Sequence, residues 1–241
     1  MRNKNVFGNY KVLIIAAGMG TRISAITSGI SKCMLQVNGK PVLQHTCDSF
    51  SSKGAGEITI VIGHSRESIE DNLVGKLNFV FNPDYANSGV LQSFFCAKHL
   101  KGQKFLFTPG DHFFDRIVLD MFENFDSDVG VIIERKKCDD EDVKTVIKDE
   151  KLFFGKQFAP DEAVGELTGL MIFNEKASKR AFEILEERIA ELKDRYVFHL
   201  LMILQEEGFE IRPLYCESSK RIEIDYPKDH AKANELAAFF K

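Results

Sequence analysis

The stretch KVLIIAAGMGTR, Lys11–Arg22, passes from an apolar run directly into two glycines two positions apart and then an arginine. Lys11–Ala17 has the composition of a strand buried on both faces. Gly18 and Gly20 permit backbone angles and a close approach that a side chain would block. Free N–H groups in such a turn can cradle phosphates, and Arg22 adds a fixed charge with several donors. The stretch therefore predicts a strand that presents a glycine turn and a cation to an anionic ligand.

Two familiar glycine motifs do not fit these letters. A dinucleotide fingerprint needs a third glycine where this chain has Ile23, and a Walker A loop needs a Gly-Lys-Ser/Thr sequence that is absent. On the glycine pair alone, a tight strand-to-loop turn with a surface arginine remains an equal alternative.

Composition narrows the class of protein. The chain has 241 residues, of which 44% are hydrophobic, enough for one substantial core. The formal net charge is −4 with acids and bases interspersed, which argues against a nucleic-acid binder. Any anionic ligand must then be met by a local cluster of cations.

The five cysteines are widely spread, with no CxxC pair, so we expect reduced thiols rather than disulfides or zinc. His64 and His112 follow predicted strands and could line a crevice, but no His/Cys cluster supports a zinc site. The first residues, MRNKNVFGNY, contain no apolar signal core, and no apolar run approaches the roughly 20 residues that span a bilayer. We expect a cytoplasmic protein with no membrane partner.

Strand-like and helical patterns alternate through the first half. The predicted strands are Lys11–Ala17, Glu57–Ile62, Lys76–Phe81, Lys104–Thr108 and Asp128–Glu134. The predicted helices are Pro41–Ser52, Ser65–Leu73 with Ser65 as its cap, Gly89–Leu100 and Asp115–Phe125. This order predicts an α/β fold of three layers, Rossmann-like, with a mostly parallel sheet between helices. Ligands of such sheets bind at the carboxyl ends of the strands, where both IIAAGMGTR and TPGD lie.

The pattern changes after about Glu134, where a charged loop begins. A hairpin is predicted at Val143–Ile147 and Leu152–Phe154, and further strands at Leu167–Phe173, Phe209–Tyr215 and Arg221–Asp225. Glu175–Gly208 is strongly helical, and Pro227–Phe240 is a closing helix. We see no repeat and no flexible linker, so we expect one domain over 1–241 with a small β-hairpin and helical elaboration.

Two motifs together resemble a known family. AAGMGTR, followed by SKCMLQVNGKPVLQH, is similar to the opening of the nucleotidyltransferases that make sugar nucleotides and CDP-alcohols. That family has a Gly-x-Gly-x-Arg loop, a Pro-Lys-x-Leu lysine and an Asn-Gly-Lys-Pro turn. Here Ser31 and Met34 replace the proline and the leucine. The resemblance implies a nucleotide-binding part at about 10–134 and an acceptor-binding elaboration at about 135–220.

The resemblance also implies catalytic roles for four residues. Arg22 would bind the leaving pyrophosphate, and Lys32 the α-phosphate or the acceptor oxygens. Asp111 and Asp225 match the family's two Mg²⁺ ligands, Asp225 opening the motif Asp-x-Pro-x-Asp. From the residues alone, Asp111 could be a turn aspartate and Asp225 a helix cap before Pro227.

Strand alternation adds a further metal candidate. It places Arg221, Glu223 and Asp225 on one face of the predicted strand. Two carboxylates on one face need a cation, which a divalent metal supplies. Glu223 is therefore a secondary candidate ligand.

Weaker matches extend the predicted site. FNPDYANSGVLQSF resembles the segment that contacts the base. VIKDEKLFFGK resembles a hairpin whose last lysine, Lys156, faces the acceptor, and GELTGL, with Glu166, resembles a motif of phosphocholine and phosphonate cytidylyltransferases. A surface location stays open for Lys156 and Glu166. The predicted nucleotide-binding residues are Ala16, Ala17, Gly18, Met19, Gly20, Ser88 and Gly89.

These motifs favour a cytidylyltransferase that joins CTP to a small phosphate or phosphonate acceptor with Mg²⁺, giving a CDP- or CMP-linked product and pyrophosphate. The absence of tryptophan weakens a choline acceptor, whose quaternary ammonium favours an aromatic cage. Two alternatives remain: a sugar-1-phosphate nucleotidyltransferase using UTP, dTTP or GTP, and a non-catalytic nucleotide-binding regulator.

Overall fold

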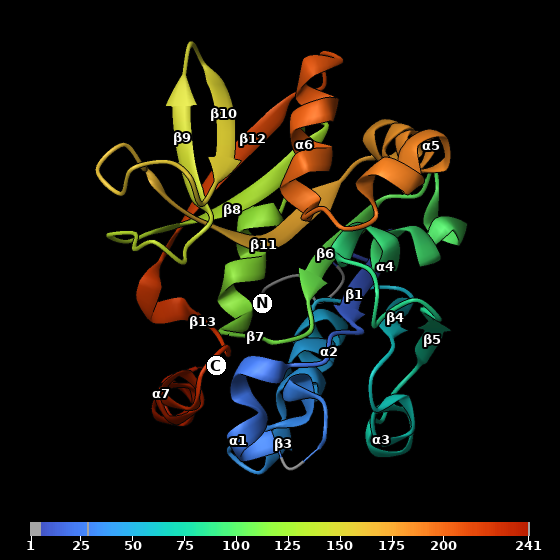
Figure 1. Cartoon of the computed structure of the whole chain (residues 1–241), viewed down its shortest axis with the longest axis vertical. Helices are drawn as coiled ribbons and strands as arrows, with labels where there is room; N and C mark the ends of the chain where they lie inside the picture. Colours follow the sequence, from blue (N-terminus) through green and yellow to red (C-terminus); the bar gives the residue numbers. More distant parts are fainter. Residues whose placement is uncertain (1–5, 28, 241) are drawn as a thin grey trace.

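A computed structural model describes residues 6–27 and 29–240, and its centre is a mixed, mostly parallel sheet (Figure 1). Strand β1 (Lys11–Ala16) lies between β4 (Ile58–Ile62) and β6 (Phe105–Pro109), parallel to both. Strand β5 (Leu77–Phe81) continues the parallel part beyond β4. The glycine turn after β1 and the Pro-Gly-Asp turn after β6 therefore lie at the same edge of the sheet.

The other half of the sheet contains antiparallel pairs. Strand β11 (Gly165–Phe173) pairs antiparallel with both β6 and β8 (Val129–Arg135), and β12 (Ile211–Glu217) lies parallel to β8. Strand β8, the next strand of the main sheet along the chain after β6, is thus separated from β6 by β11. Strands β9 (Lys144–Lys148) and β10 (Lys151–Gly155) form the predicted hairpin, joined to the start of β11.

Helices cover both faces, which confirms the three-layer Rossmann-like prediction. One face carries α4 (Val90–Cys96), α5 (Glu175–Leu192) and α6 (Val197–Glu206). The opposite face carries α2 (Val42–Ser52), α3 (Arg66–Asn72) and the 3-10 helix η4 (Arg116–Phe122). Alternate side chains of β1 enter the two cores, with Leu13 on the first face and Val12 and Ile14 on the second.

The region predicted as strongly helical, Glu175–Gly208, contains two helices. Lys193–Tyr196 separates α5 from α6, because the carbonyls of Lys193 and Arg195 accept backbone N–H groups from the start of α4. Gly89 makes this contact possible: a Cβ at Gly89 would lie 2.8 Å from the backbone of Asp194.

Two further helix predictions are corrected. The segment expected to be helical over Asp115–Phe125 is a 3-10 helix over Arg116–Phe122, and the side chain of Asp115 accepts the N–H of Ile117. Ser65 precedes α3 but does not cap it, since its hydroxyl donates to the carbonyl of Gly29.

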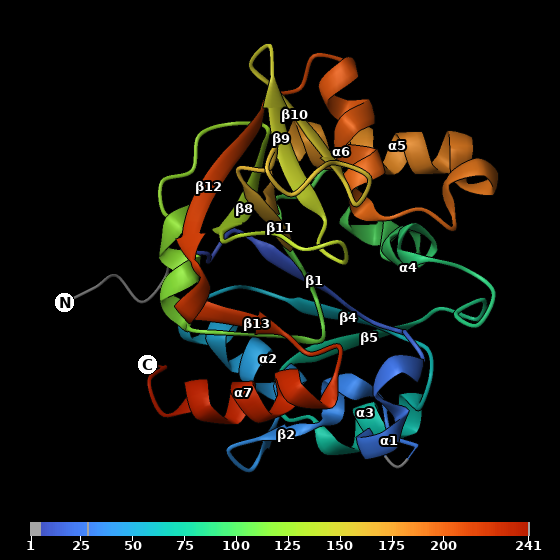
Figure 2. The ribbon, with the colours of Figure 1, turned by 60° about the vertical axis from the view of Figure 1, so that its left-hand side comes forward.

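The C-terminal elements form a separate layer (Figure 2). Strand β13 (Arg221–Glu223) pairs antiparallel with β7 (His112–Phe114) outside the main sheet. Helix α7 (Pro227–Ala237) packs on β2 (Gln36–Val37) and β13, around a small core that includes Ile224 and Ala233. The remaining short elements are η1 (Thr21–Ile23), α1 (Ser24–Thr27), η2 (Lys32–Met34), β3 (Lys40–Pro41), η3 (Lys98–Leu100) and η5 (Ser218–Lys220).

No helix within residues 6–27 and 29–240 has both the length and the apolar composition needed to cross a bilayer.

Candidate active site

Two cavities meet at the carboxyl edge of the sheet. The first, of about 300 Å³, is lined by the glycine turn, by Ser31–Cys33 and by the start of α4. The second, of about 660 Å³, lies between β11, the segments that flank the β9–β10 hairpin, β13 and the start of α7. The residues that line both are Arg22, Lys32, Val90, Phe107, Pro109, Asp111 and Asp225. All four predicted catalytic residues therefore lie at the junction of the cavities.

The ammonium of Lys32 joins the two aspartates. Its Nζ lies 2.6 Å from Oδ2 of Asp111 and 2.6 Å from Oδ1 of Asp225. Arg22 donates from Nη1 to the other oxygen of Asp225, at 2.9 Å. Burial by itself would lower the pKa of Lys32, but the charges of Asp111 and Asp225 outweigh it and raise that pKa. The charge of Asp225 likewise raises the pKa of the more exposed Arg22.

The glycine turn has the local geometry that this arrangement requires. Gly20 has φ of 60°, in the left-handed region, and a Cβ there would lie 3.2 Å from Cβ of Lys32. The turn can therefore lie directly against the lysine. Within residues 6–27 and 29–240, and apart from its two chain neighbours, no atom lies within 4 Å of a Cβ added at Gly18, and Gly18 lines the first cavity.

Asp225 is not the cap of α7. The carboxylate of Asp229 accepts the backbone N–H of Tyr226 at 2.7 Å and that of Asp225 at 3.1 Å. The second aspartate of the Asp-x-Pro-x-Asp motif is thus the N3 residue of a capping box whose N-cap residue is Tyr226, which leaves the first, Asp225, to contact Lys32 and Arg22.

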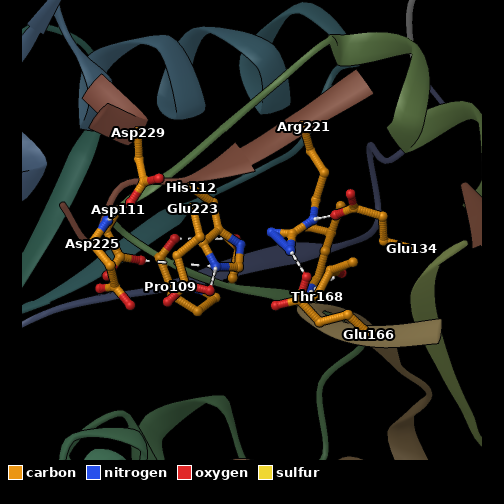
Figure 3. Close-up of polar contacts among 12 residues, drawn as sticks. Pro109, Asp111, His112, Glu134, Glu166, Thr168, Arg221, Glu223, Asp225 and Asp229 are labelled. Carbon is orange, nitrogen blue, oxygen red and sulfur yellow. Dashed lines mark hydrogen bonds and ion pairs between the residues drawn. The ribbon is translucent and has the colours of Figure 1, made fainter. Parts of the chain in front are cut away.

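Asp111 also belongs to a group of residues that could bind a metal ion, together with His112 and Glu223 (Figure 3). Nε2 of the buried His112 lies 3.5 Å from Glu223 and 3.9 Å from Asp111, and one ligand atom from each residue falls within 4.8 Å of the others. Desolvation opposes the ionisation of Glu223, yet the hydrogen bond and charge of His112 lower its pKa to about 2. The sequence left the role of His112 open. The feature that points to His112 is its position directly after Pro-Gly-Asp, next to the candidate ligand Asp111.

The donor set fits a magnesium ion. Oδ1 of Asp111 is buried without a hydrogen-bond partner in residues 6–27 and 29–240, although a carboxylate oxygen of this kind normally has one. Carboxylate oxygens are the protein ligands that Mg²⁺ prefers, and Asp111 and Glu223 bring them together beside His112. Asp225 lies outside this group, and its two oxygens contact Lys32 and Arg22.

The predicted nucleotide-binding residues are brought together with one exception. Ala16, Ala17, Gly18, Gly20, Ser88 and Gly89 line the first cavity. Met19 does not, and this residue is 45% exposed. The hydroxyl of Ser88 donates to the carbonyl of Asp84, so this turn is held by its own hydrogen bond. Tyr85, which sequence reasoning did not select, also lines this cavity.

Both predicted acceptor residues line the second cavity. Lys156 is partly exposed, and its Nζ lies 3.3 Å from Glu141. Glu166 is buried rather than at the surface and pairs with Arg221 at 2.8 Å and with Lys136 at 3.0 Å. His64 lines neither cavity, and its Nδ1 lies 3.0 Å from the hydroxyl of Ser65.

The chain belongs to the family described as the MobA-like NTP transferase domain, whose profile matches residues 12–188. It is therefore a nucleotidyltransferase, which sets aside the alternative of a non-catalytic regulator.

Among its relatives is the choline-phosphate cytidylyltransferase of Streptococcus pneumoniae, 24% identical over 232 residues, covering 94% of this chain and 97% of that relative. The CMP-5'-(3-aminopropyl)phosphonate synthase of Streptomyces rubellomurinus is 30% identical over 115 residues, which is 46% of this chain and only 18% of that relative's length. The inositol-1-phosphate CTP transferase of T. maritima has the same fold, with a TM-score of 0.80 over 98% of this chain and 97% of that one, at 19% identity.

Proposed function

We propose that this nucleotidyltransferase is a cytidylyltransferase, which joins CTP to a small phosphate or phosphonate acceptor and releases pyrophosphate. The observation that carries the proposal is the position of Lys32, Asp111 and Asp225 at the junction of two cavities. A transferase of this kind needs one space for each substrate and charge compensation where they meet. The first cavity would take the nucleotide and the second the acceptor.

The chemistry follows from charge and alignment. An ionised acceptor oxygen attacks the α-phosphorus of the triphosphate, and the bond to the leaving pyrophosphate breaks. A phosphate or phosphonate is already ionised near pH 7, so the site needs no general base. Lys32 would donate to the α-phosphate as charge develops there, and Arg22 to the departing pyrophosphate.

Asp111, Asp225 and Glu223 would hold Mg²⁺, which supplies charge neutralisation at the phosphates when it is bound. The buried, unpartnered oxygen of Asp111 supports a cation there. His112 would orient Glu223, since its Nε2 lies 3.5 Å from that carboxylate.

CTP is the proposed nucleotide. A relative that covers nearly the whole chain is named as a cytidylyltransferase. Backbone groups near Ala16–Ala17 and Ser88–Gly89 line the first cavity and would read the edge of the base. Hydrogen bonding to one base edge gives strong selection, because the wrong base leaves buried polar groups unpaired.

The second cavity favours a small polar acceptor. Its lining is rich in charged groups of both signs, among them Lys136, Lys156 and Glu166. Phe198 and the partly exposed Tyr196 and Tyr226 also line it, but no tryptophan is available for a quaternary ammonium. The mixed charges support an aminoalkyl phosphonate or another small phosphoester as the acceptor at least as well as phosphocholine, for which the three aromatic residues would have to replace a tryptophan.

A sugar-1-phosphate acceptor with UTP, dTTP or GTP is the alternative, because about 660 Å³ is ample for a hexose ring. A pyrophosphate-release screen decides between the two. Five triphosphates are tested with Mg²⁺ against phosphomonoesters, phosphonates and sugar 1-phosphates. We expect release with CTP and a small acceptor. Release only with UTP or dTTP and a sugar phosphate would replace the proposal by the alternative.

A further inference from the structure

Two buried glutamates lie side by side on neighbouring strands of the main sheet. Glu134 on β8 and Glu166 on β11 are direct partners in the antiparallel register, and their exposed fractions are 5% and 7%. Like charges directly opposite each other destabilise a sheet, and burial removes the water that would screen them. This pair needs a cation that reaches both carboxylates.

Arg221 is that cation (Figure 3). Its Nε donates to Oε2 of Glu134 at 2.6 Å, and its Nη2 donates to Oε2 of Glu166 at 2.8 Å. Burial would lower the pKa of Arg221, but the charges of Glu166 and Glu134 raise it. The planar guanidinium can serve two carboxylates at fixed angles, which a lysine ammonium does less well.

The same residue begins the strand β13, which carries Glu223 and leads directly to Asp225. Glu223 and Asp225 follow Arg221 at alternate positions, and β13 is three residues long and pairs only with β7 among the described strands. Among the described strands, the main chain of β13 thus forms no strand pairing with the main sheet. The side chain of Arg221, in contrast, forms hydrogen bonds to residues on two strands of that sheet. In Figure 3 the guanidinium lies between the two glutamates and the His112–Glu223 pair.

We propose that Arg221 is a positioning residue that anchors β13 to the main sheet and so aims Glu223 and Asp225 at Asp111 and Lys32. This inference rests on the proposed function for its consequence in catalysis. The anchor also reaches the second cavity, since Glu166 accepts from Lys136 at 3.0 Å and Lys136 lines that cavity. The acceptor side and the metal side of the site therefore share one buried ion network.

Binding of Mn²⁺ to the protein without substrates, followed by electron paramagnetic resonance, tests the inference. Arg221→Lys keeps the positive charge but lacks the planar guanidinium that contacts both glutamates. We expect it to weaken Mn²⁺ binding about 10–100-fold, the usual effect of losing a group that orients metal ligands. Its kcat should fall while the KM for the triphosphate changes little, because the glycine turn and Arg22, which would bind the triphosphate, are not altered.

Two further variants separate positioning from stability. The triple variant Arg221→Met/Glu134→Gln/Glu166→Gln removes the network without leaving an unpaired buried charge, and it should fold yet still bind Mn²⁺ weakly. Leu185→Ala, in the core under α5, should lower the melting temperature and leave Mn²⁺ affinity unchanged.

Wild-type Mn²⁺ affinity in both Arg221 variants would overturn the inference and leave Arg221 a purely structural residue. The outcome does not depend on the acceptor or the nucleotide. If the wild-type protein transfers no nucleotide but the variants lose Mn²⁺, the positioning role stands and the proposed function fails.

Discussion

Nζ of Lys32 lies 2.6 Å from Oδ1 of Asp225, although 193 positions separate the two residues in the sequence. The contact joins the loop after β1 to the segment after β13, and Asp111 after β6 completes it. Three distant segments thus supply one charged centre.

Lys32→Ala should lower kcat by about 10²–10³, as for the loss of one preorganised donor. Charge builds on the α-phosphate as the acceptor oxygen approaches, so the lysine helps the transition state more than the ground state. The affinity for the triphosphate should fall much less, because the glycine turn and Arg22 remain. Steady-state kinetics and equilibrium binding measure the two effects. Lys32→Arg serves as the matched variant and should not restore the full rate. An increased KM with unchanged kcat would show that Lys32 gives only uniform binding.

Asp111→Asn and Asp225→Asn should each lower turnover by several orders of magnitude and leave the fold intact. Both remove a charged oxygen that would bind Mg²⁺. Activity should also vanish in excess chelator and return with Mg²⁺. The melting temperature of each variant, measured beside its activity, is the control. Full activity in chelator would remove the metal from the mechanism.

Asp229→Ala removes the N3 carboxylate of the capping box at the start of α7 and should lower the free energy of unfolding by about 1 kcal/mol, as for other lost capping interactions. For a chain of this length that corresponds to a fall of roughly 2–4 °C in melting temperature. The carboxylate accepts the N–H groups of both Tyr226 and Asp225. Asp229→Asn keeps an acceptor and should cost less. Calorimetry compares the melting temperatures of both Asp229 variants with that of Asp225→Asn. A larger fall in melting temperature in Asp225→Asn would show that Asp225 caps the helix.

CTP should have a higher kcat/KM than UTP, dTTP, GTP or ATP with the preferred acceptor. The polar backbone groups of the first cavity would pair with only one base edge, and the wrong base would leave some of them unsatisfied. Competition between CTP and UTP in one reaction gives the ratio directly. Equal kcat/KM values for the two pyrimidine nucleotides would contradict base selection.

The buried thiols should make stability fall at high pH. Burial raises the pKa of Cys33 to about 12, whereas the thiol ionises near 9 when it is unperturbed. Above pH 9 the unfolded state loses this proton and the folded state keeps it, so the thiol's contribution is complete below pH 9 and is lost as pH rises towards 12. The difference in free energy of unfolding between wild type and Cys33→Ala should therefore shrink over that window. Thiol labelling at pH 8 should modify the half-buried Cys96 before Cys33. Equal labelling rates in the folded protein would contradict the burial argument.

The sequence by itself determined the local elements and the identity of the central residues. The apolar run before Gly18 and Gly20 predicts β1 and its turn, and strand-end aspartates at Asp111 and Asp225 predict where carboxylates collect. These features depend on a few neighbouring residues, since periodicity, turn chemistry and strand alternation are local properties.

Tertiary structure alone decided the pairings. It placed β11 between β6 and β8, broke the expected helix at Lys193–Tyr196 against the start of α4, and gave the capping role to Asp229 rather than Asp225. It also buried Glu166 and joined it to Glu134 through Arg221. A charged residue in a sequence carries no mark of its partner, because the partner is chosen by strand order and burial, and both arise only from contacts between segments far apart in the chain.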